Sequence, residues 1–431
     1  MSTGAASRAP ESERAKDRQR DGTRQATPRT RRAECCVVGG GPAGVVLGLM
    51  LAREGVGVTV LEAQTSFERQ FRGNTLNPAV LKIMEDLGLI EDLLKLRHAE
   101  VRTFVVQTNG VHETFADFGR LRCSYPYVLM LPQARFLEFV TREAGRHPNF
   151  ELVMGAKVHG LIEEDGAVRG VRYRGPGGAG EVRADLTVGA DGRFSKVRRL
   201  SGLRARAGHS PMDVLWFNLP REVGDPEGAG AIFRCGPGSL LVLMDHFDYW
   251  QVGFIVEKGS YKRVKEAGLP ALQESVASLA PEFAGRVGRL SGWEEVSLLT
   301  VESDMLRRWS RPGLLLLGDA AHVVSPVGGV GINLAIQDAV VAANTLAGPR
   351  RAGTLGAGHL RAVQRRREWP VRVVQAAQDA AQRWVVAGVL EADAPYELPL
   401  AVRLGLKTPV LRDVPTRLIA LGARQVRPKT R

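Results

Sequence analysis

The hydrophobic pattern near the start of the chain predicts two buried strands joined by a helix. Residues 35–38 form an apolar run of strand length, and residues 45–52 form a helix-like apolar run just after a Gly-rich turn. Residues 56–61 form a third run, which ends at the acid Glu62. This order of strand, turn, helix, strand and acid predicts a Rossmann-type unit.

The turn carries Gly39-x-Gly41-x-x-Gly44, and Glu62 follows Gly44 by 18 residues. That spacing is close to the roughly 20 residues expected for an acid that binds a ribose. Gly39 permits a tight turn, Gly41 lets a pyrophosphate approach the backbone, and Gly44 lets helix and strand pack closely. The phosphates would lie on free N–H groups at the positive end of the helix. The flanking apolar runs argue against a plain surface loop, so the turn predicts a dinucleotide site, for either NAD(P) or FAD.

Two later motifs also place an acid after an apolar strand. One apolar run ends at Asp191-Gly192 and leads into a helix. In the other, residues 314–317 lead to Asp319, and a Gly-rich loop then opens a helix over residues 332–346. Both motifs thus repeat the order of apolar strand, acid and helix.

The three motifs, in this order, resemble the flavoprotein aromatic hydroxylases of the para-hydroxybenzoate hydroxylase type, over about residues 34–400. The resemblance implies an α/β fold: a Rossmann-type FAD-binding domain with an inserted, mostly antiparallel β-sheet substrate domain and a helical C-terminal region. It implies FAD as cofactor, NADPH or NADH as reductant, and O2. A flavin C4a-hydroperoxide would then hydroxylate an aromatic, quinone or polyketide-like small molecule.

The resemblance also implies roles for matching positions. Glu62 would bind the adenosine ribose, and Asp319 would bind the ribityl chain. The loop 326–333 would lie against the isoalloxazine ring, with N–H groups of Gly331 and Ile332 at its pyrimidine edge. The full set of expected FAD contacts is Gly39, Gly41, Pro42, Ala43, Gly44, Glu62, Arg72, Gln133, Asp191, Asp319, Pro326, Gly331, Ile332 and Asn333.

Several of the residues in these motifs have a simpler interpretation. Asp191, placed near the flavin and the approach of NAD(P)H, is also suited to cap a helix. His322 follows the strand that positions Asp319, so we interpret it as structural rather than as a base. Asp338 is suited to pair locally within its helix, and Gln133 and Arg72 rest on the resemblance alone. No residue is predicted to act as a catalytic base.

Between the second and third motifs, four strand-like runs predict the inserted sheet: residues 213–219, 231–234, 239–244 and 249–256. The last run alternates, with Trp250, Val252, Phe254 and Val256 on one face. In the resembled family this sheet roofs the flavin and forms the substrate pocket. The aromatic residues suit either a pocket or plain core, and the polar candidates nearby are Asn218, His246 and Gln251.

The predicted organisation has five parts. Residues 1–33 form a disordered basic tail, 34–200 the first part of the FAD-binding domain, and 201–300 the β-sheet substrate domain. Residues 301–350 return to the FAD-binding domain, and 351–431 form a helical C-terminal region with a basic end. The net charge of +13 resides almost wholly in the two ends, so it does not describe the folded body.

Composition narrows the remaining choices. The four cysteines show no Cys-x-x-Cys spacing, which disfavours a zinc site or a disulfide framework and suits a reducing cytoplasm. The basic ends lack interleaved aromatics, so we expect no nucleic-acid partner. No transmembrane segment is predicted. The stretch from Leu398 is typical of an amphipathic segment that packs on the body, with peripheral contact to anionic lipid as the alternative. The sequence does not predict an oligomeric state.

Other activities of the same fold stay open at this stage. A halogenase would carry Trp-x-Trp-x-Ile-Pro, but the nearest match, beginning at Trp216 and ending at Pro220, has one tryptophan and leucine in place of isoleucine. A flavin-dependent reductase, or an FAD-binding redox sensor or scaffold that performs no oxygenation, is the further alternative.

Overall fold

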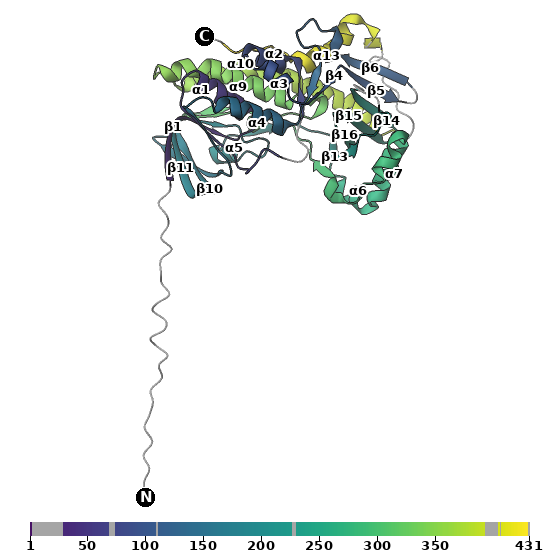
Figure 1. Cartoon of the computed structure of the whole chain (residues 1–431), viewed down its shortest axis with the longest axis horizontal. Helices are drawn as coiled ribbons and strands as arrows, with labels where there is room; N and C mark the ends of the chain where they lie inside the picture. Colours follow the sequence, from purple (N-terminus) through teal and green to yellow (C-terminus); the bar gives the residue numbers. More distant parts are fainter. Residues whose placement is uncertain are drawn as a thin grey trace.

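The computed structural model describes residues 1, 29–68, 74–108, 111–225, 230–392, 404–405 and 407–429. Two large sheets dominate this part of the chain, one parallel at its centre and the other mostly antiparallel. Figure 1 shows long helices layered over the first sheet, with the second sheet beside it.

The first sheet has β1 at its centre, and its parallel strands follow the order β20-β11-β1-β2-β8. The bounds are β1 (Arg29–Val38), β2 (Val58–Leu61), β8 (Phe150–Val153), β11 (Gly178–Gly189) and β20 (Leu314–Leu316). The antiparallel strands β9 (Lys157–Glu164), β10 (Ala167–Gly175) and β19 (Ser310–Arg311) extend it. The strand order reverses at β1, because β2 lies on one side of it and β11 on the other. In sheets of this type, ligands bind in the crevice at the carboxyl ends of the strands where the order reverses, which here is the carboxyl end of β1.

The helix layer over this sheet consists of α1 (Pro42–Arg53), α4 (Gln133–Ala144), α9 (Gly331–Arg351) and α10 (Ala357–Ala381). Helix α1 contacts α4 and α9, and α10 lies on α9. The segment Val327–Arg351 has the length and composition to cross a membrane, but 83% of its apolar window is buried inside the protein. Packing in the core therefore accounts for its apolar composition.

The second sheet has the order β17-β13-β16-β15-β14-β5-β6, with one parallel pair, β14 and β5. The bounds are β5 (Thr103–Thr108), β6 (Val111–Asp117), β13 (Met212–Pro220), β14 (Ala231–Gly236), β15 (Ser239–Asp245), β16 (Tyr249–Glu257) and β17 (Ser297–Leu299). The four strands predicted here are present. On β16, the predicted face with Trp250 and Phe254 packs against α7 (Leu269–Leu279), and Ile255 belongs to the opposite face.

Two strands of this second sheet correct the predicted domain boundaries. Strands β5 and β6 come from within residues 34–200, which the sequence assigned to the other domain. Register joins Phe104 to Ala231 and Val106 to Phe233 in the parallel pair. The sequence predicted that one inserted segment, residues 201–300, forms the whole second sheet. The structure shows that the hairpin of β5 and β6, about 100 residues earlier in the chain, is also part of it.

Two small sheets and several short helices complete the described residues. The small sheets combine β3 (Thr75–Leu76), β4 (Ala99–Val101) and β7 (Val128–Met130), and β12 (Ala205–Ala207), β18 (Asp304–Leu306) and β21 (His322–Val323). The other α-helices are α2 (Pro78–Asp86), α3 (Ile90–Leu94), α5 (Lys196–Ser201), α6 (Tyr261–Ala267), α8 (Ala284–Val287), α11 (Ala387–Leu390) and α13 (Pro409–Leu421).

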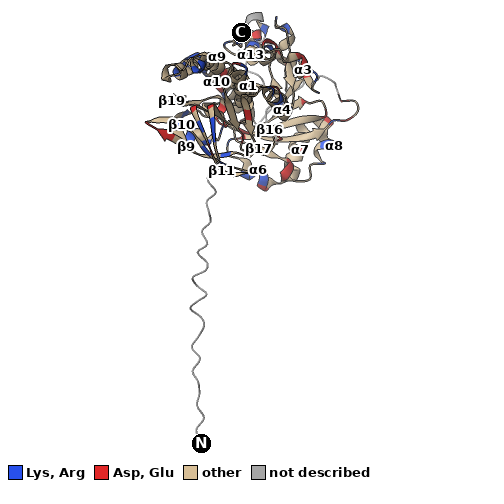
Figure 2. Ribbon diagram, turned by 60° about the vertical axis from the view of Figure 1, so that its left-hand side comes forward, with Lys and Arg blue, Asp and Glu red and all other residues tan. Residues whose placement is uncertain are grey.

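The C-terminal helix α13 packs one side on the body, as predicted, but Leu411 and Val414 of the same helix are exposed, so only part of its apolar surface is covered. Residues 398–403 and 406 of the predicted stretch lie outside the described part of the chain. Thr416 and Ala420 are buried, and Arg417 is exposed. Thr416 Oγ1 accepts a hydrogen bond from the Asp117 N–H at 3.1 Å, and the Ile419 carbonyl accepts one from Asn77 Nδ2 at 2.7 Å. Helix α13 is thus joined to the second sheet, through Asp117, and to the start of α2, through Asn77. Figure 2 shows acidic and basic residues interspersed over the body.

The first strand corrects the predicted tail. Strand β1 begins at Arg29, and its residues 29–33 pair with β11, so the prediction that residues 1–33 precede the fold is wrong for its last five residues. Arg31 Nε also lies 3.0 Å from Glu151 Oε1. Residues 29–33 give little sign of a strand in the sequence, because three of the five are arginine and the segment lacks an apolar run. Residues 2–28 of the predicted tail lie outside the described part of the chain.

Deleting residues 2–28 is expected to leave the melting temperature nearly unchanged, whereas deleting residues 2–33 is expected to lower it by a few degrees. The longer deletion removes the strand pairing from Arg29 to Ala33 and the ion pair of Arg31. Differential scanning calorimetry of both proteins decides between the two boundaries. Equal melting temperatures would show that residues 29–33 contribute nothing to stability.

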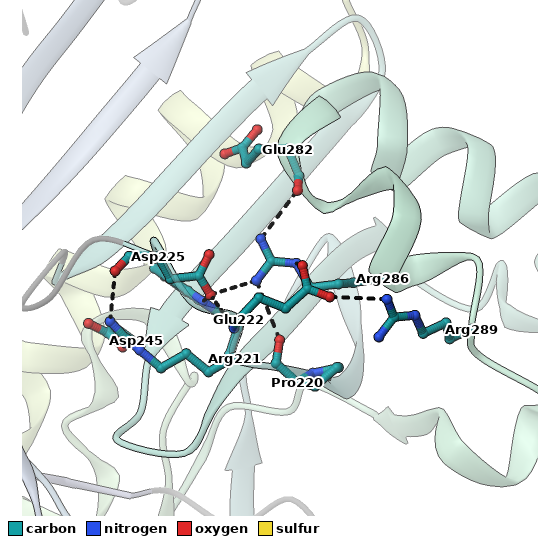
Figure 3. Close-up of polar contacts among 9 residues, drawn as sticks. Pro220, Arg221, Glu222, Asp225, Asp245, Glu282, Arg286 and Arg289 are labelled. Carbon is teal, nitrogen blue, oxygen red and sulfur yellow. Dashed lines mark hydrogen bonds and ion pairs between the residues drawn. The ribbon is translucent and has the colours of Figure 1, made fainter.

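An ion network fixes the segment that follows β13 (Figure 3). Arg286 Nη1 donates to Asp225 Oδ2 at 2.6 Å, and Trp250 Nε1 donates to the same oxygen at 2.9 Å. Arg221 pairs with Asp245 close by. Burial would raise the pKa of Asp225, but the hydrogen bonds and the charge of Arg286 lower it from 3.8 to about 2. This network anchors the end of β13 to α8.

Asp225→Asn is expected to lower the free energy of unfolding at pH 7 by about 2 kcal/mol, because the pKa of this carboxyl is lower in the folded protein than in the unfolded chain. Its contribution is complete above about pH 4 and disappears as the pH falls toward 2. Urea unfolding at pH 7 and pH 3 measures it. The control is Glu222→Gln, which removes the exposed pair with Arg289 and a long contact, 3.9 Å, with Arg286, and should cost well under about 1 kcal/mol. Equal losses for both variants would contradict the assignment.

Candidate functional site

The Gly-rich turn after β1 has the geometry that its three glycines require. Gly39 has φ +108°, and a Cβ there would lie 2.3 Å from the Ala190 carbonyl oxygen. A Cβ on Gly44 would lie 1.9 Å from the Gly39 carbonyl oxygen, so helix α1 and the turn touch through backbone alone. A Cβ on Gly41 would meet nothing within 4 Å. The turn is therefore tight on both sides and open at Gly41.

Helix α1 starts at this open point. Gly41 is its N-cap, Pro42 occupies the first turn, and among the described residues no side chain caps the helix. The first turn also carries no acidic residue. The N–H groups of Ala43 and Gly44 are thus at the positive end of a helix, in an arrangement that suits an anionic group.

Glu62 follows β2 and is buried, with 3% of its surface exposed. Its Oε2 accepts a hydrogen bond from the Gly40 N–H at 2.8 Å, and its Oε1 accepts one from the Gln64 N–H at 2.9 Å. Glu62 therefore braces the Gly-rich turn. A carboxylate oxygen accepts more than one hydrogen bond, so the same group can also receive ribose hydroxyls.

The third motif meets the first one in space. Strand β20 leads into a 3-10 turn, η4 (Gly318–Ala320), and Gly318 has φ +57°. A Cβ on Gly318 would lie 3.1 Å from Ala335 Cβ and 3.7 Å from Ala43 Cβ. The turn is thus wedged between α9 and the start of α1. Asp319, half-buried, follows at the edge of this junction.

The loop before α9, residues 324–330, is held by the Thr75 side chain of β3 and by the Asn333 side chain of α9, which also bonds the backbone of Asn77 just before α2. Thr75 Oγ1 donates to the Gly329 carbonyl at 2.8 Å. Asn333 Oδ1 accepts from the Asn77 N–H at 2.9 Å, and Asn333 Nδ2 donates to the Gly329 carbonyl at 3.0 Å. Asn333 therefore fixes this loop. Pro326, at the start of the loop, is half-buried.

Helix α9 begins at Gly331, and Ile332 follows it in the first turn. As at α1, among the described residues no side chain caps the helix, and its first turn holds no acid. Both residues are half-buried. Their N–H groups form a second positive helix end, close to the turn that carries Asp319.

Asp191 supports the start of α5, whose N-cap is Ser195, so the helix-capping alternative holds in part. Its Oδ1 accepts from Ser195 Oγ at 2.5 Å, and its Oδ2 accepts from the Val197 N–H at 3.0 Å, at the start of α5. Burial raises the pKa of Asp191, and these hydrogen bonds oppose the rise. Gln133 is the first residue of α4, and its N–H donates to Asn74 Oδ1 at 3.3 Å. Arg72 lies outside the described residues.

His322 is structural in this chain, as interpreted from the sequence. It is 1% exposed, and its Nε2 lies 2.6 Å from Asp338 Oδ2. The alternative of a purely local partner for Asp338 is wrong, because Asp338 Oδ1 also accepts from Arg367 Nε of α10 at 2.7 Å. Burial would raise the pKa of Asp338, but the charges and hydrogen bonds of His322 and Arg367 outweigh burial and lower it.

A family profile described as an FAD binding domain matches residues 32–377. The chain belongs to this FAD binding domain family. It is 37% identical over 402 residues to a 6-methylpretetramide 4-monooxygenase of Streptomyces rimosus, with 91% of this chain and 93% of that protein covered. The predictions of FAD as cofactor and of an FAD-dependent monooxygenase are confirmed.

Solved structures agree on the fold. The p-nitrophenol 4-monooxygenase PnpA of Pseudomonas putida DLL-E4 superposes with a TM-score of 0.74 at 22% identity, covering 92% of this chain and all of that one. The flavin-dependent brominase Bmp2 gives 0.75 at 18% identity, covering 90% and 93%. At such identities the likeness shows the fold alone, and the predicted α/β flavoprotein fold is confirmed.

The residues at the site fit FAD. The open space at Gly41 and the uncapped start of α1 suit a pyrophosphate, and the second uncapped helix start, at Gly331, suits an electron-rich ring edge. The carboxylates of Asp319 and Glu62 are suited to accept hydrogen bonds from hydroxyl groups of the ribityl chain and of the adenosine ribose. Gly41, Glu62 and Asp319 each follow the carboxyl end of a parallel strand of the first sheet, namely β1, β2 and β20.

Sequence reasoning missed several residues that hold the FAD site together. Gln378 Nε2 of α10 donates to the carbonyls of Ser325 and Val327 at 2.8 and 2.7 Å, fixing the loop before α9. Asn77 caps α2, where its Oδ1 accepts from the Val80 N–H at 3.3 Å. The Asn77-Pro78 pair is a helix-start signature that sequence reasoning could have used. Gln378 gives no such local signal.

Proposed function

We propose that this monooxygenase hydroxylates a multi-ring aromatic, polyketide-like small molecule with O2 and NADPH or NADH. The observation that carries the proposal is the 37% identity, across nearly the full length of both chains, to a 6-methylpretetramide 4-monooxygenase. A 12-dehydrotetracycline 5-monooxygenase/anhydrotetracycline 6-monooxygenase, 28% identical over 72% of this chain, supports the same substrate class.

The proposed FAD contacts follow the geometry of the site. The pyrophosphate would lie at Gly41 and the start of α1, the adenosine ribose at Glu62, and the ribityl chain at Asp319. The pyrimidine edge of the ring would accept hydrogen bonds from the N–H groups of Gly331 and Ile332. The contacts from Arg72, Gln133, Asp191, Pro326 and Asn333 stay predictions, and Asp191 and Asn333 would act chiefly by fixing α5 and the loop before α9.

The substrate region would lie between that loop and the facing side of the second sheet. Phe115, Trp216, Phe233 and Met244 are only partly buried on this side, and Val327 of the loop packs in the same cluster. By contrast, the strand face with Trp250 is buried under helices on the far side. The aromatic and Met side chains near Val327 therefore provide an apolar surface suited to a flat ring system.

Polar groups occur on the same side of the sheet. His246 Nε2 lies 3.2 Å from Gln251 Oε1, and the His246 ring stacks on Tyr249 at 4.6 Å. Burial lowers the pKa of His246 to about 4, so it is neutral at pH 7. A neutral, buried imidazole is suited to hydrogen-bond a substrate oxygen and is too weak a base to take up a phenolic proton. Asn218, the third polar candidate, is exposed.

When bound, FAD supplies the redox chemistry with O2. The chain's own task is to hold the ring, exclude water and orient the substrate carbon. In the described residues this task would fall to the loop before α9, to the second sheet and to α13, whose Ile419 packs beside Gly328.

The test is a reaction of the purified yellow protein with 6-methylpretetramide under ¹⁸O2, with NADPH and with NADH. Acid precipitation should release FAD. One atom of ¹⁸O in the product, and NAD(P)H oxidation stimulated by the substrate, is the expected result. Reduction without ¹⁸O uptake would point to a reductase, a bromide-dependent product to a halogenase, and no substrate-stimulated turnover with any phenol or quinone tested to a sensor or scaffold.

We propose a cytoplasmic location. Cys35, Cys36 and Cys235 are free and buried, and Cys123 is free and half-buried, as suits a reducing compartment.

A further inference from the structure

One buried carboxylate receives hydrogen bonds from three separate parts of the fold. Asp338, in the third turn of α9, is fully buried. Its Oδ2 accepts from the Gly318 N–H at 3.0 Å and from His322 Nε2 at 2.6 Å, and its Oδ1 accepts from Arg367 Nε at 2.7 Å. The Gly-Asp turn, the strand β21 and the helix α10 are thus all tied to α9 at one point.

Stability alone is a poor explanation for this cluster. Removing Asp338 and Arg367 from water is costly, and well-packed apolar residues often stabilise such a position as well or better. The hydrogen bonding is also incomplete: His322 Nδ1 and Arg367 Nη1 are buried and have no hydrogen-bond partner in the described part of the chain. The uncertain gain in stability leaves room for a second role of the cluster.

The contact with Gly318 points to that role. Gly318 precedes Asp319, and its turn has a left-handed φ of +57°. Gly331 starts α9 two helical turns before Asp338. A single rigid helix therefore carries both the Gly331 N–H and the carboxylate that fixes the Gly-Asp turn. The distance between the Asp319 side chain and the start of α9 is set through Asp338.

We propose that Asp338 is a positioning residue for FAD. It acts through the Gly318 N–H and aligns Asp319 with the first turn of α9, so that the ribityl chain and the pyrimidine edge of the same FAD molecule are bound together. Asp338 itself does not touch the cofactor. The proposal rests on the FAD contacts proposed above for Asp319 and Gly331.

The test separates the hydrogen-bond acceptor from the buried charge. Arg367→Met first removes the cation that a neutral residue at position 338 would leave unpaired. In that background, D338N keeps an oxygen for the Gly318 N–H, and D338L does not. We expect D338N/R367M to bind FAD within about threefold of R367M, and D338L/R367M to bind it tenfold or more weakly, with a shifted flavin absorption spectrum and reduction potential.

FAD dissociation constants from flavin fluorescence and potentials from dye equilibration give the readouts, with circular dichroism reporting the fold. Equal FAD affinity and equal spectra for the two double variants, whatever their melting temperatures, would overturn the proposal and leave Asp338 a purely structural residue. If D338L/R367M does not fold, D338S/R367M replaces it, because the shorter serine side chain cannot reach Gly318.

Combining the position 338 variants with Asp319→Ala separates this proposal from the one on which it rests. If Asp338 acts through Asp319, the loss of FAD affinity caused by D319A should be several-fold smaller in D338L/R367M than in R367M. Strictly additive losses would contradict positioning through Asp319. A D319A protein with unchanged FAD affinity would instead show that the assignment of the ribityl contact is wrong.

Discussion

Asp319→Ala is expected to weaken FAD binding about tenfold to a hundredfold while the protein keeps its fold. Asp319 is half-buried on η4, next to Gly318, which packs against Ala43 of α1 and Ala335 of α9, and its loss would remove the acceptor proposed for the ribityl hydroxyls. Each such group costs about 1–3 kcal/mol when buried and unpaired. FAD dissociation followed by fluorescence gives the affinity, and circular dichroism reports folding.

Two further variants act as controls. Asp185→Ala removes an exposed carboxylate of the same domain, paired with Arg350, and should leave FAD affinity unchanged. His322→Ala should lower the melting temperature, because His322 is buried against Asp338, but it should cost far less FAD affinity than Asp319→Ala. If Asp319→Ala keeps the affinity of the unmodified protein and His322→Ala loses it, the Gly-Asp motif has been assigned to the wrong side chain.

Gly44→Ala is expected to lower the stability of the protein, whereas Gly41→Ala is expected to lower its affinity for FAD. A methyl group at position 44 would lie 1.9 Å from the Gly39 carbonyl oxygen, so α1 must move away from the turn. Such overpacking costs about 1–3 kcal/mol of stability even without FAD. At position 41 the methyl meets no protein atom within 4 Å, and the backbone there, with φ −75°, accepts alanine.

The stability of the FAD-free protein should therefore be unchanged in Gly41→Ala, while FAD affinity falls at least about tenfold, because the methyl group occupies space needed by the pyrophosphate. Urea unfolding of the apoproteins, followed by FAD titration, separates the two effects. Unimpaired FAD binding by Gly41→Ala would place the pyrophosphate elsewhere, and an unaltered apoprotein stability for Gly44→Ala would contradict the backbone contact.

The sequence predicted those parts of the fold whose signals are local. Apolar runs next to glycines define β1, α1 and β2, because the same few residues fix both the strand ends and the turn. The alternation of Trp250 and Phe254 predicted the two faces of β16 correctly. Strand β5 is also rich in β-branched residues, but no local feature of its sequence indicates that it pairs with β14.

The residues of the site also differ in whether local sequence features reveal them. The glycines and acids of the three motifs could be found from spacing, since each lies within a few residues of the strand that positions it. The cluster around Asp338 could not, because His322 and Arg367 lie 16 and 29 residues away and α10 brings Arg367 back over α9. Asn77 and Gln378 likewise act on backbone segments that are distant in the sequence.

The parallel pairing of β5 with β14 has a consequence for how the chain reaches its fold. The chain leaves the first sheet to build β5 and β6, returns for β8 and β11, and leaves again for β13 to β16. Arg193 Nη1 adds a later tie between the two parts, at 3.2 Å from the Thr300 carbonyl. Neither sheet can be completed from one continuous segment, so cutting the gene at any single loop should yield fragments that aggregate rather than two stable halves. Assembly must await contacts between distant residues, and such long-range topologies fold slowly.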